Sequence, residues 1–454
     1  MSTQDSSEKK ENSVEHGAFV TTDSFNDLAD AYSSPKLLSV SNRNQEVSSS
    51  NSYDERAQLY PEDDEDTLYV ESEEFKREDK HVFVLSKAGK PVYSLHGNED
   101  KLVTKMATII GLISVAESIR KKDTLKEIVA GNRKIVFVVK EYLVLVAISS
   151  RGQSTSYLNL LLNYVHNQIL CLLTYTKLKW KFDNRSNFDL RNILAGDNTD
   201  KFFSNLISDF DINPSYMLCS VRCLPVPDNI RNSLGKVIAN AGSKNINKIA
   251  FALLICDNLL TTESLVPICF PHFDNAGYLF AFLSFLDANL CLILITASDE
   301  DQLLNMRETK KQILEKAHKP LSVIRQIATE RPNYEVSAIG IPELRHFMYK
   351  NRMSAQWHAP NFTSPFSTPD EQSKLIQLYE SVHAAMHTPG CPLMTFWKAA
   401  DRHNIMATST NEHEVYAIFS PLTSKAVAHY SMQKIIKWVK KEETKYVIWN
   451  SPTF

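Results

Sequence analysis

Two histidines, His383 and His387, have the spacing in this sequence that best fits metal chemistry. They are four positions apart in a segment that we predict to be a helix, so both imidazoles lie on one helix face. Zinc needs three or four protein ligands, and no cysteine or glutamate stands at a supporting spacing near them in the sequence. We therefore interpret them as surface or helix-end histidines. An enzyme that uses them is the weakest of our functional hypotheses.

Other groups that resemble catalytic or binding motifs are also incomplete. Cys219 and Cys223 lie in an apolar run that we predict to be a strand, and without a second pair we interpret them as free core thiols. Gly89-Lys90-Pro91 looks like a piece of a phosphate loop, but Pro91 lacks a backbone donor and stands where Ser or Thr would hold magnesium. The sequence contains no dinucleotide-binding, serine-hydrolase, zinc-protease or kinase signature. We predict no catalytic residue, no metal and no cofactor, and expect a protein that acts through its surfaces.

The segment that contains Gly89 has a clear structural pattern. Two short apolar runs in residues 81–94 flank the turn at 87–90 and predict a β-hairpin. A helix is predicted from Asp100 to Ile119, and it is apolar on every side. Such a helix must be covered on two sides. Its own sheet can cover one side, which leaves the other for a partner.

Small side chains follow one face of this predicted helix. Ala107, Gly111, Ser114 and Ser118 are spaced 4-3-4, and Ile110 lies beside them. A glycine inside a helix costs roughly 1 kcal/mol relative to alanine, so close approach of another backbone is a reason to keep it. We expect these five residues to form a binding surface. The neighbour is either the equivalent helix of a partner or the second helix of the same domain.

The rest of the chain repeats a similar order of strands and helices. We expect three α+β units, each an antiparallel sheet with helices covering one face. The predicted strands are 134–139, 142–148, 248–255, 278–285, 290–295, 345–349 and 415–419, and the predicted helices begin near Ser154, Asp299, Pro369 and Pro421.

Charge is distributed unevenly along the 454 residues. Residues 1–79 contain 20 acidic and 7 basic side chains, a local charge of −13, whereas the remainder carries +10. The segment is also rich in serine, so we predict a disordered arm, either regulatory or simply solvated. The seven single cysteines and the missing signal peptide favour a cytoplasmic protein. The longest apolar stretch, 278–295, is predicted to be two strands and not a membrane span.

The last predicted helix carries four lysines, Lys434, Lys437, Lys440 and Lys441, beside apolar residues. A basic amphipathic helix can lie on an anionic membrane, and the same pattern is typical of a solvated helix face. No nucleic-acid motif accompanies these lysines. We therefore predict no nucleic-acid partner.

From about residue 80 to Phe454 the chain resembles the SAND family of vacuolar fusion proteins, also named for monensin sensitivity. The blocks that carry the resemblance are Lys80-His81-Val82-Phe83-Val84-Leu85-Ser86, Ala88-Gly89-Lys90-Pro91-Val92-Tyr93-Ser94, Phe188-Asp189-Leu190-Arg191, Arg222-Cys223-Leu224-Pro225, Pro267-Ile268-Cys269-Phe270-Pro271, Leu344-Arg345-His346-Phe347-Met348-Tyr349-Lys350, Ser420-Pro421-Leu422 and Trp438-Val439-Lys440-Lys441-Glu442-Glu443.

The resemblance implies three longin domains, which we place at 80–200, 201–320 and 321–454. It also implies that the chain is one subunit of a guanine-nucleotide exchange factor. This subunit would form an obligate heterodimer with a second three-longin protein. The complex would activate the late-endosomal Rab GTPase on anionic phosphoinositide membranes of endosomes and of lysosomes or vacuoles. It would thereby promote endosome maturation, fusion and autophagosome maturation. Exchange works by differential binding of conformational states and needs no covalent chemistry. A non-catalytic longin adaptor or tether subunit is the alternative.

One departure from the family concerns the middle domain. The family has a second hairpin strand and a long helix between the first strand and the Pro-x-Cys-x-Pro block. Here only eight residues separate Asn258 from Pro267. We therefore expect a middle domain shortened near 258–267, with the apolar side chains of Phe251, Leu253 and Ile255 and of the strands within 278–295 left bare.

Overall fold

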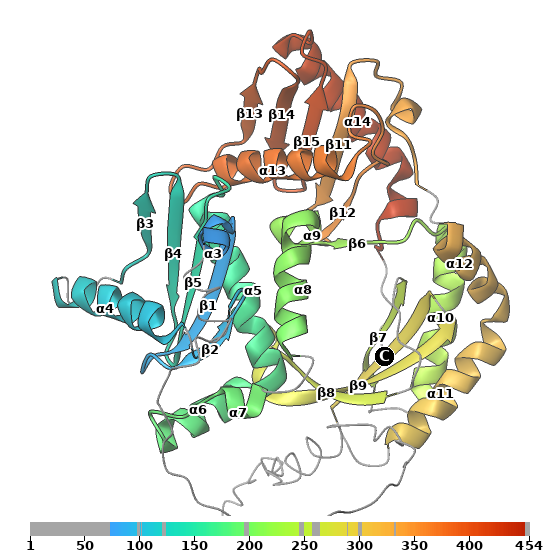
Figure 1. Ribbon diagram of the computed structural model, residues 1–454. Coiled ribbons are helices and arrows are strands. Elements are labelled where there is room, and N and C mark those ends of the chain that lie inside the picture. The colour runs from blue at the N-terminus through green and yellow to red at the C-terminus, as the bar shows by residue number, and fades with distance from the viewer. Residues whose placement is uncertain are drawn as a thin grey trace, which may run out of the picture. The chain divides into compact units, whose positions relative to one another are not determined.

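The computed structural model describes residues 73–97, 100, 102–119, 124–194, 199–244, 249–256, 264–287, 289–297, 302–330 and 333–449 (Figure 1). Most of the acidic arm, residues 1–72, lies outside these ranges. Its last residues do not fit the predicted disorder, because Glu73–Arg77 form helix α3. Phe75 of α3 is only 5% exposed and packs into the hydrophobic core on one face of the first sheet. Helix α3 is therefore part of the fold.

The predicted hairpin opens the first of three sheets. Strands β1 (Lys80–Ser86) and β2 (Pro91–Ser94) are joined by a turn in which Gly89 has a φ of 86°. Pro91 starts an edge strand, where its missing N–H is tolerated. The sheet is antiparallel in the order β2-β1-β5-β4-β3, and its other strands are β3 (Glu127–Ala130), β4 (Arg133–Val139) and β5 (Leu143–Ser149).

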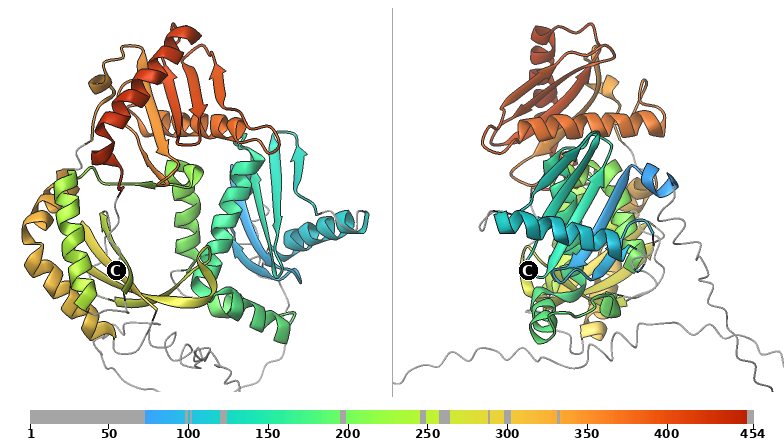
Figure 2. Two further views of the ribbon diagram at one scale, coloured as in Figure 1. Left: turned by 180° about the vertical axis from the view of Figure 1, so that it is seen from behind. Right: turned by 60° about the vertical axis from the view of Figure 1, so that its left-hand side comes forward.

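Helices cover both faces of the first sheet, which corrects the expectation that they cover only one. Helix α4 (Val103–Ile119) packs on the face that contains Phe83 and Val144. Helix α5 (Thr155–Leu173) packs on the face that contains Val82 and Leu145 (Figure 2). Alternate residues of a strand point to opposite faces, and β1 is apolar on both of them. Such a strand has to be enclosed between two layers.

The third sheet repeats the first. Its order, β13-β14-β15-β11-β12, matches β3-β4-β5-β1-β2, and helices α13 and α14 cover opposite faces. A short strand, β6 (Val221–Arg222), adds parallel to β12. The elements are β11 (Leu344–Asn351), β12 (Gln356–His358), α13 (Pro369–Met386), β13 (Thr395–Lys398), β14 (Asn404–Ser409), β15 (His413–Phe419) and α14 (Lys425–Tyr446).

The middle sheet has four strands in the order β7-β10-β9-β8. Comparison with the first sheet shows that, among the residues described between 249 and 297, nothing corresponds to β2 or to α4. This matches the expected shortening, although residues 257–263 lie outside the described chain. The elements are α10 (Asp228–Lys244), β7 (Ile249–Cys256), β8 (Ser264–Phe270), β9 (Asp274–Asp287), β10 (Leu290–Thr296), α11 (Gln302–Lys316) and α12 (His318–Glu330).

Helices α10, α11 and α12 pack on one face of this sheet, and the other face is open only in part. On β7, Phe251 and Leu253 are 44% and 47% exposed, as expected. The β8–β9 side is not bare, because α5 and α6 (Tyr175–Asn184) pack against it. The Tyr278 hydroxyl donates to the Leu172 carbonyl at 2.8 Å. Helices α5 and α6 therefore pack on the β8–β9 side of the middle sheet, where bare apolar side chains were expected.

Short helices connect the first sheet to the rest of the chain: α7 (Arg191–Leu194), α8 (Thr199–Ile212), α9 (Pro214–Leu218) and, before β11, the 3-10 turn η1 (Val336–Ile339). Helix α8 buries Phe203 and Phe210 in the hydrophobic core that α5 shares with α13. Cys219 caps α9 in a left-handed conformation and is exposed. Cys223 is half-buried, so the expectation of two core thiols in a strand was wrong.

Candidate partner interface

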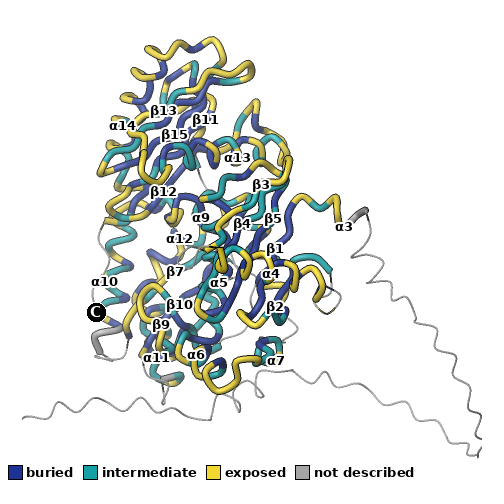
Figure 3. The backbone as a smooth tube through the Cα atoms, turned by 90° about the vertical axis from the view of Figure 1, so that its left-hand side faces the viewer, coloured by how far each residue is buried: buried dark blue, intermediate teal, exposed yellow. Residues whose placement is uncertain are grey.

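Helix α4 presents an apolar outer face. Its inner face buries Met106, Ile109 and Ile113 against the first sheet. On the opposite side Val115 and Ile119 are 58% and 74% exposed, and α4 is largely exposed along its length (Figure 3). We call the exposed residues Val103, Thr104, Ala107, Thr108, Gly111, Leu112, Ser114, Val115, Ser118 and Ile119 the outer face of α4.

The five residues predicted from sequence do not all lie on this outer face. Ala107, Gly111, Ser114 and Ser118 are exposed, whereas Ile110 is half-buried and packs against the first core. A Cβ placed on Gly111 would meet no heavy atom within 4 Å. Helix α5 lies across the sheet from α4, so the second helix of the same unit does not cover the glycine.

The corresponding helix of the third unit is in a different environment. Helix α13 packs against α5, α8 and α9, and its apolar residues join the same core as those of α5. The sequence predicted an additional partner for α4 and none for α13. Among the described residues, α5, α8 and α9 pack on the outer side of α13, whereas no described element packs on the outer face of α4.

All four predicted membrane-facing lysines are exposed on α14. The apolar face of that helix, including Met432, Ile435 and Val439, is buried on the third sheet. Lys440 pairs with Glu412 at 3.0 Å. Because its apolar side is occupied, α14 cannot insert that side into a bilayer. Any contact with lipid would be electrostatic.

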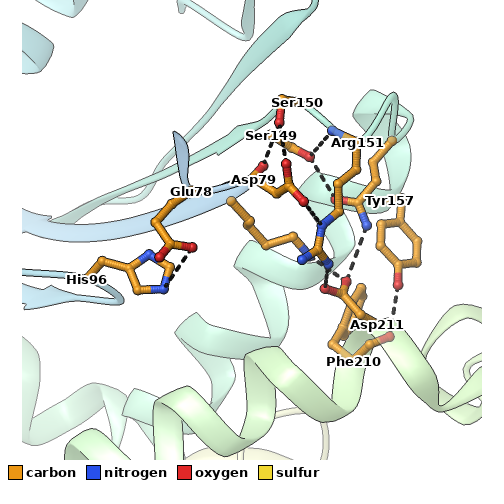
Figure 4. Close-up of polar contacts among 11 residues, drawn as sticks. Glu78, Asp79, His96, Ser149, Ser150, Arg151, Tyr157, Phe210 and Asp211 are labelled. Atoms are coloured by element: carbon orange, nitrogen blue, oxygen red, sulfur yellow. Dashed lines mark hydrogen bonds and ion pairs between the residues drawn. The ribbon is translucent and has the colours of Figure 1, made fainter. Parts of the chain in front are cut away.

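A buried ionic cluster lies where β1, the start of α5 and α8 meet (Figure 4). Lys80 pairs with Asp211, and Arg151 Nη1 is 2.8 Å from Asp211 Oδ2. Gln153 donates to Asp211 at 3.2 Å, while Tyr157 donates to the Phe210 carbonyl at 2.8 Å. Lys80 is 4% exposed, and its burial lowers its pKa despite the attraction of Asp211.

The third unit contributes Glu380 of α13 to the same place. Its carboxylate accepts a hydrogen bond from the Ser154 amide, 3.3 Å from Glu380 Oε1. Burial raises the pKa of Glu380 to about 7, although the Ser154 amide and the charge of Lys80 act in the opposite direction. A carboxyl group that titrates near neutral pH therefore sits where α13 meets α5. Sequence patterns could not reveal this cluster, because Lys80 and Asp211 are 131 residues apart.

No helix in the described ranges has the length and apolar character needed to span a bilayer.

Comparisons with known proteins agree with the topology. The family model for the first longin domain of FUZ, MON1 and HPS1 matches residues 80–206, and the model for their third longin domain matches residues 343–443. Protein SAND of Takifugu rubripes is 34% identical in an alignment of 418 positions that covers 85% of this chain and 79% of the relative. Vacuolar fusion protein MON1 homolog A of Gallus gallus is 33% identical over 83% of this chain and 73% of the relative. Vacuolar fusion protein MON1 homolog B of Homo sapiens is 29% identical over 84% of this chain and 78% of the relative. The predicted resemblance and α+β longin fold are confirmed.

Proposed function

Because this chain belongs to the SAND/MON1 family of vacuolar fusion proteins, a family of membrane-trafficking proteins, we propose that it is one subunit of a guanine-nucleotide exchange factor. Its partner is a second three-longin protein, and its target is the late-endosomal Rab GTPase. The chain works in the cytoplasm and is recruited peripherally to endosomal and to lysosomal or vacuolar membranes, where it promotes endosome maturation, fusion and autophagosome maturation.

The observation that carries the proposal is the outer face of α4. Val115 and Ile119 are more than half exposed, so each forfeits much of the roughly 1.5–3 kcal/mol that full burial of such a side chain supplies. A partner helix packed along the small residues would recover this energy, because small side chains let two helix backbones approach closely. Exchange itself requires only that the complex bind an open state of the GTPase more tightly than the nucleotide-bound state.

The partner-binding step is tested with Gly111→Leu. Gly111 is exposed on a helix and has no close neighbour, so leucine should stabilise the isolated chain by up to about 1 kcal/mol through helix propensity. The same side chain should abolish co-purification of the partner, because it holds the two helices apart. Ser381→Leu, which adds a leucine on the exposed side of α13, is the matched control and should retain the partner. Partner binding by Gly111→Leu at the wild-type level would remove α4 from the interface.

The exchange step is tested by fluorescent-nucleotide release from a panel of Rab GTPases. Release should accelerate only with the co-expressed pair and only for the late-endosomal member. If the pair forms but accelerates none of them, the chain is a non-catalytic adaptor or tether subunit.

We assign membrane recruitment to electrostatics. Each lysine near an anionic surface contributes about 1 kcal/mol, so the four lysines of α14 suffice for weak, salt-sensitive binding.

The acidic arm competes for such basic surface. Deleting residues 1–72 should increase binding to anionic liposomes at low salt and leave the melting temperature unchanged. Deleting 1–79 should lower that temperature, because it also removes buried Phe75. Equal liposome binding with and without the arm would eliminate competition by the arm.

A further inference from the structure

A carboxylate completes the histidine pair that looked incomplete in the sequence. His383 lies in the last turn of α13 and His387 caps its end, with the centres of the two rings 4.3 Å apart. Strand β15 places Glu414 beside them. One ligand atom from each of the three side chains lies within 4.8 Å of the other two.

The spacing of these atoms fits a small divalent metal. His387 Nε2 is 3.4 Å from Glu414 Oε2. Two ligands that are each about 2.0–2.1 Å from a tetrahedral zinc lie roughly 3.3–3.4 Å apart. His387 Nε2 is enclosed by protein but lacks a hydrogen bond of good geometry. Burying a polar atom without such a bond is costly, and a metal would satisfy it.

The two oxygens of Glu414 face different partners. Oε1 is 3.6 Å from Lys350 Nζ and 3.6 Å from Arg352 Nε, while Oε2 accepts a hydrogen bond from the Tyr416 hydroxyl at 3.0 Å. The cations hold one oxygen and leave the other directed at the histidines. Partners of this kind commonly orient a metal-binding carboxylate.

We propose that His383, His387 and Glu414 bind a divalent transition metal of the zinc type, with water in the remaining position. The metal ties the C-terminal end of α13 to β15 and so fixes the helix on which the first and third units meet. Lys350 and Arg352 repel the ion, so the affinity should be lower than that of a closed structural zinc site.

The test uses the full chain, freed of metal with a chelator, and Zn²⁺ alone as the probe in isothermal titration calorimetry. We expect one equivalent to bind, and binding to weaken at least tenfold in His387→Gln and in Glu414→Gln. His429→Gln, at an exposed position on α14, is the matched control and should bind like the wild type. His387 is one-third exposed, so its variant should melt like the wild type in chelator.

Cobalt distinguishes this site from stray thiols. Co²⁺ held by two imidazoles and a carboxylate should give visible ligand-field bands without sulfur charge transfer, whereas exposed Cys219 or Cys391 would add a charge-transfer band. The proposal is overturned if the wild type binds no stoichiometric zinc. Equal binding by His387→Gln, or a spectrum dominated by sulfur charge transfer, would overturn it as well.

Discussion

The carboxyl group of Glu380 should make this chain lose stability as the pH rises toward neutral. The group is 5% exposed, and its pKa rises from 4.5 to about 7 on folding. A raised carboxyl pKa means that the folded state holds the proton more tightly than the unfolded state. The stability linked to Glu380 is therefore fully present below pH 4.5 and is lost as the pH rises toward 7.

The size of the effect follows from the shift. A change of about 2.5 pKa units corresponds to about 3 kcal/mol at 1.36 kcal/mol per unit. Glu380→Gln has the same shape and keeps an oxygen to accept the hydrogen bond from Ser154, but it does not titrate. The variant should match the wild type at pH 4.5 and be more stable by up to about 3 kcal/mol at pH 8.

The measurement is urea-induced unfolding of the full chain, followed by circular dichroism at several pH values between 4.5 and 8. The chain has several units, so the first transition is the one compared. Glu308→Gln, which changes an exposed carboxylate on α11, is the control and should follow the wild-type profile. A constant difference between Glu380→Gln and the wild type across this range would show that Glu380 does not titrate there, and the reasoning from burial would be wrong.

Three further changes test other parts of the fold. Asp211→Ala leaves buried Lys80 unpaired and should reduce the free energy of unfolding by about 3–5 kcal/mol. Lys374→Ala, which breaks an exposed pair, should change it by less than about 1 kcal/mol; similar losses would contradict the role of burial. Thr368→Ala removes the capping box of α13 and should cost about 1 kcal/mol in the same assay, whereas Thr368→Ser should cost less. Phe251→Thr with Leu253→Thr should reduce aggregation of the isolated chain measured by light scattering, and unchanged scattering would mean that this open face is not the cause.

The elements that sequence could predict are those with a strong repeating pattern. The hairpin, α4, α5 and α13 follow from apolar periodicity and from caps such as Ser154. The short strands β3, β12, β13 and β14 gave no such signal, because three to six residues are too few for a period to emerge. Periodicity also gave no means of deciding how many layers cover a sheet.

The candidate sites also differ in whether their residues lie close together in the sequence. The stripe at Ala107 and Gly111 lies within one helix, so its spacing could be read directly from the chain. Glu414 reaches His383 and His387 only because β15 lies under the end of α13. Glu414 is 27 residues from His387 in the sequence, so local spacing gives no sign of this third ligand. Pairing between distant elements is a property of the tertiary fold, which a single sequence does not display.

Strand β7 forms an edge of the middle sheet. In the first unit the strand at the corresponding position, β1, is paired on both sides, whereas no described strand pairs with β7 on the side away from β10. One row of peptide N–H and C=O groups is therefore open to another extended segment. A strand added there would give the middle sheet the five-stranded order of the first sheet. The β7 edge is therefore the part of the middle sheet where an extended peptide segment has backbone groups to pair with.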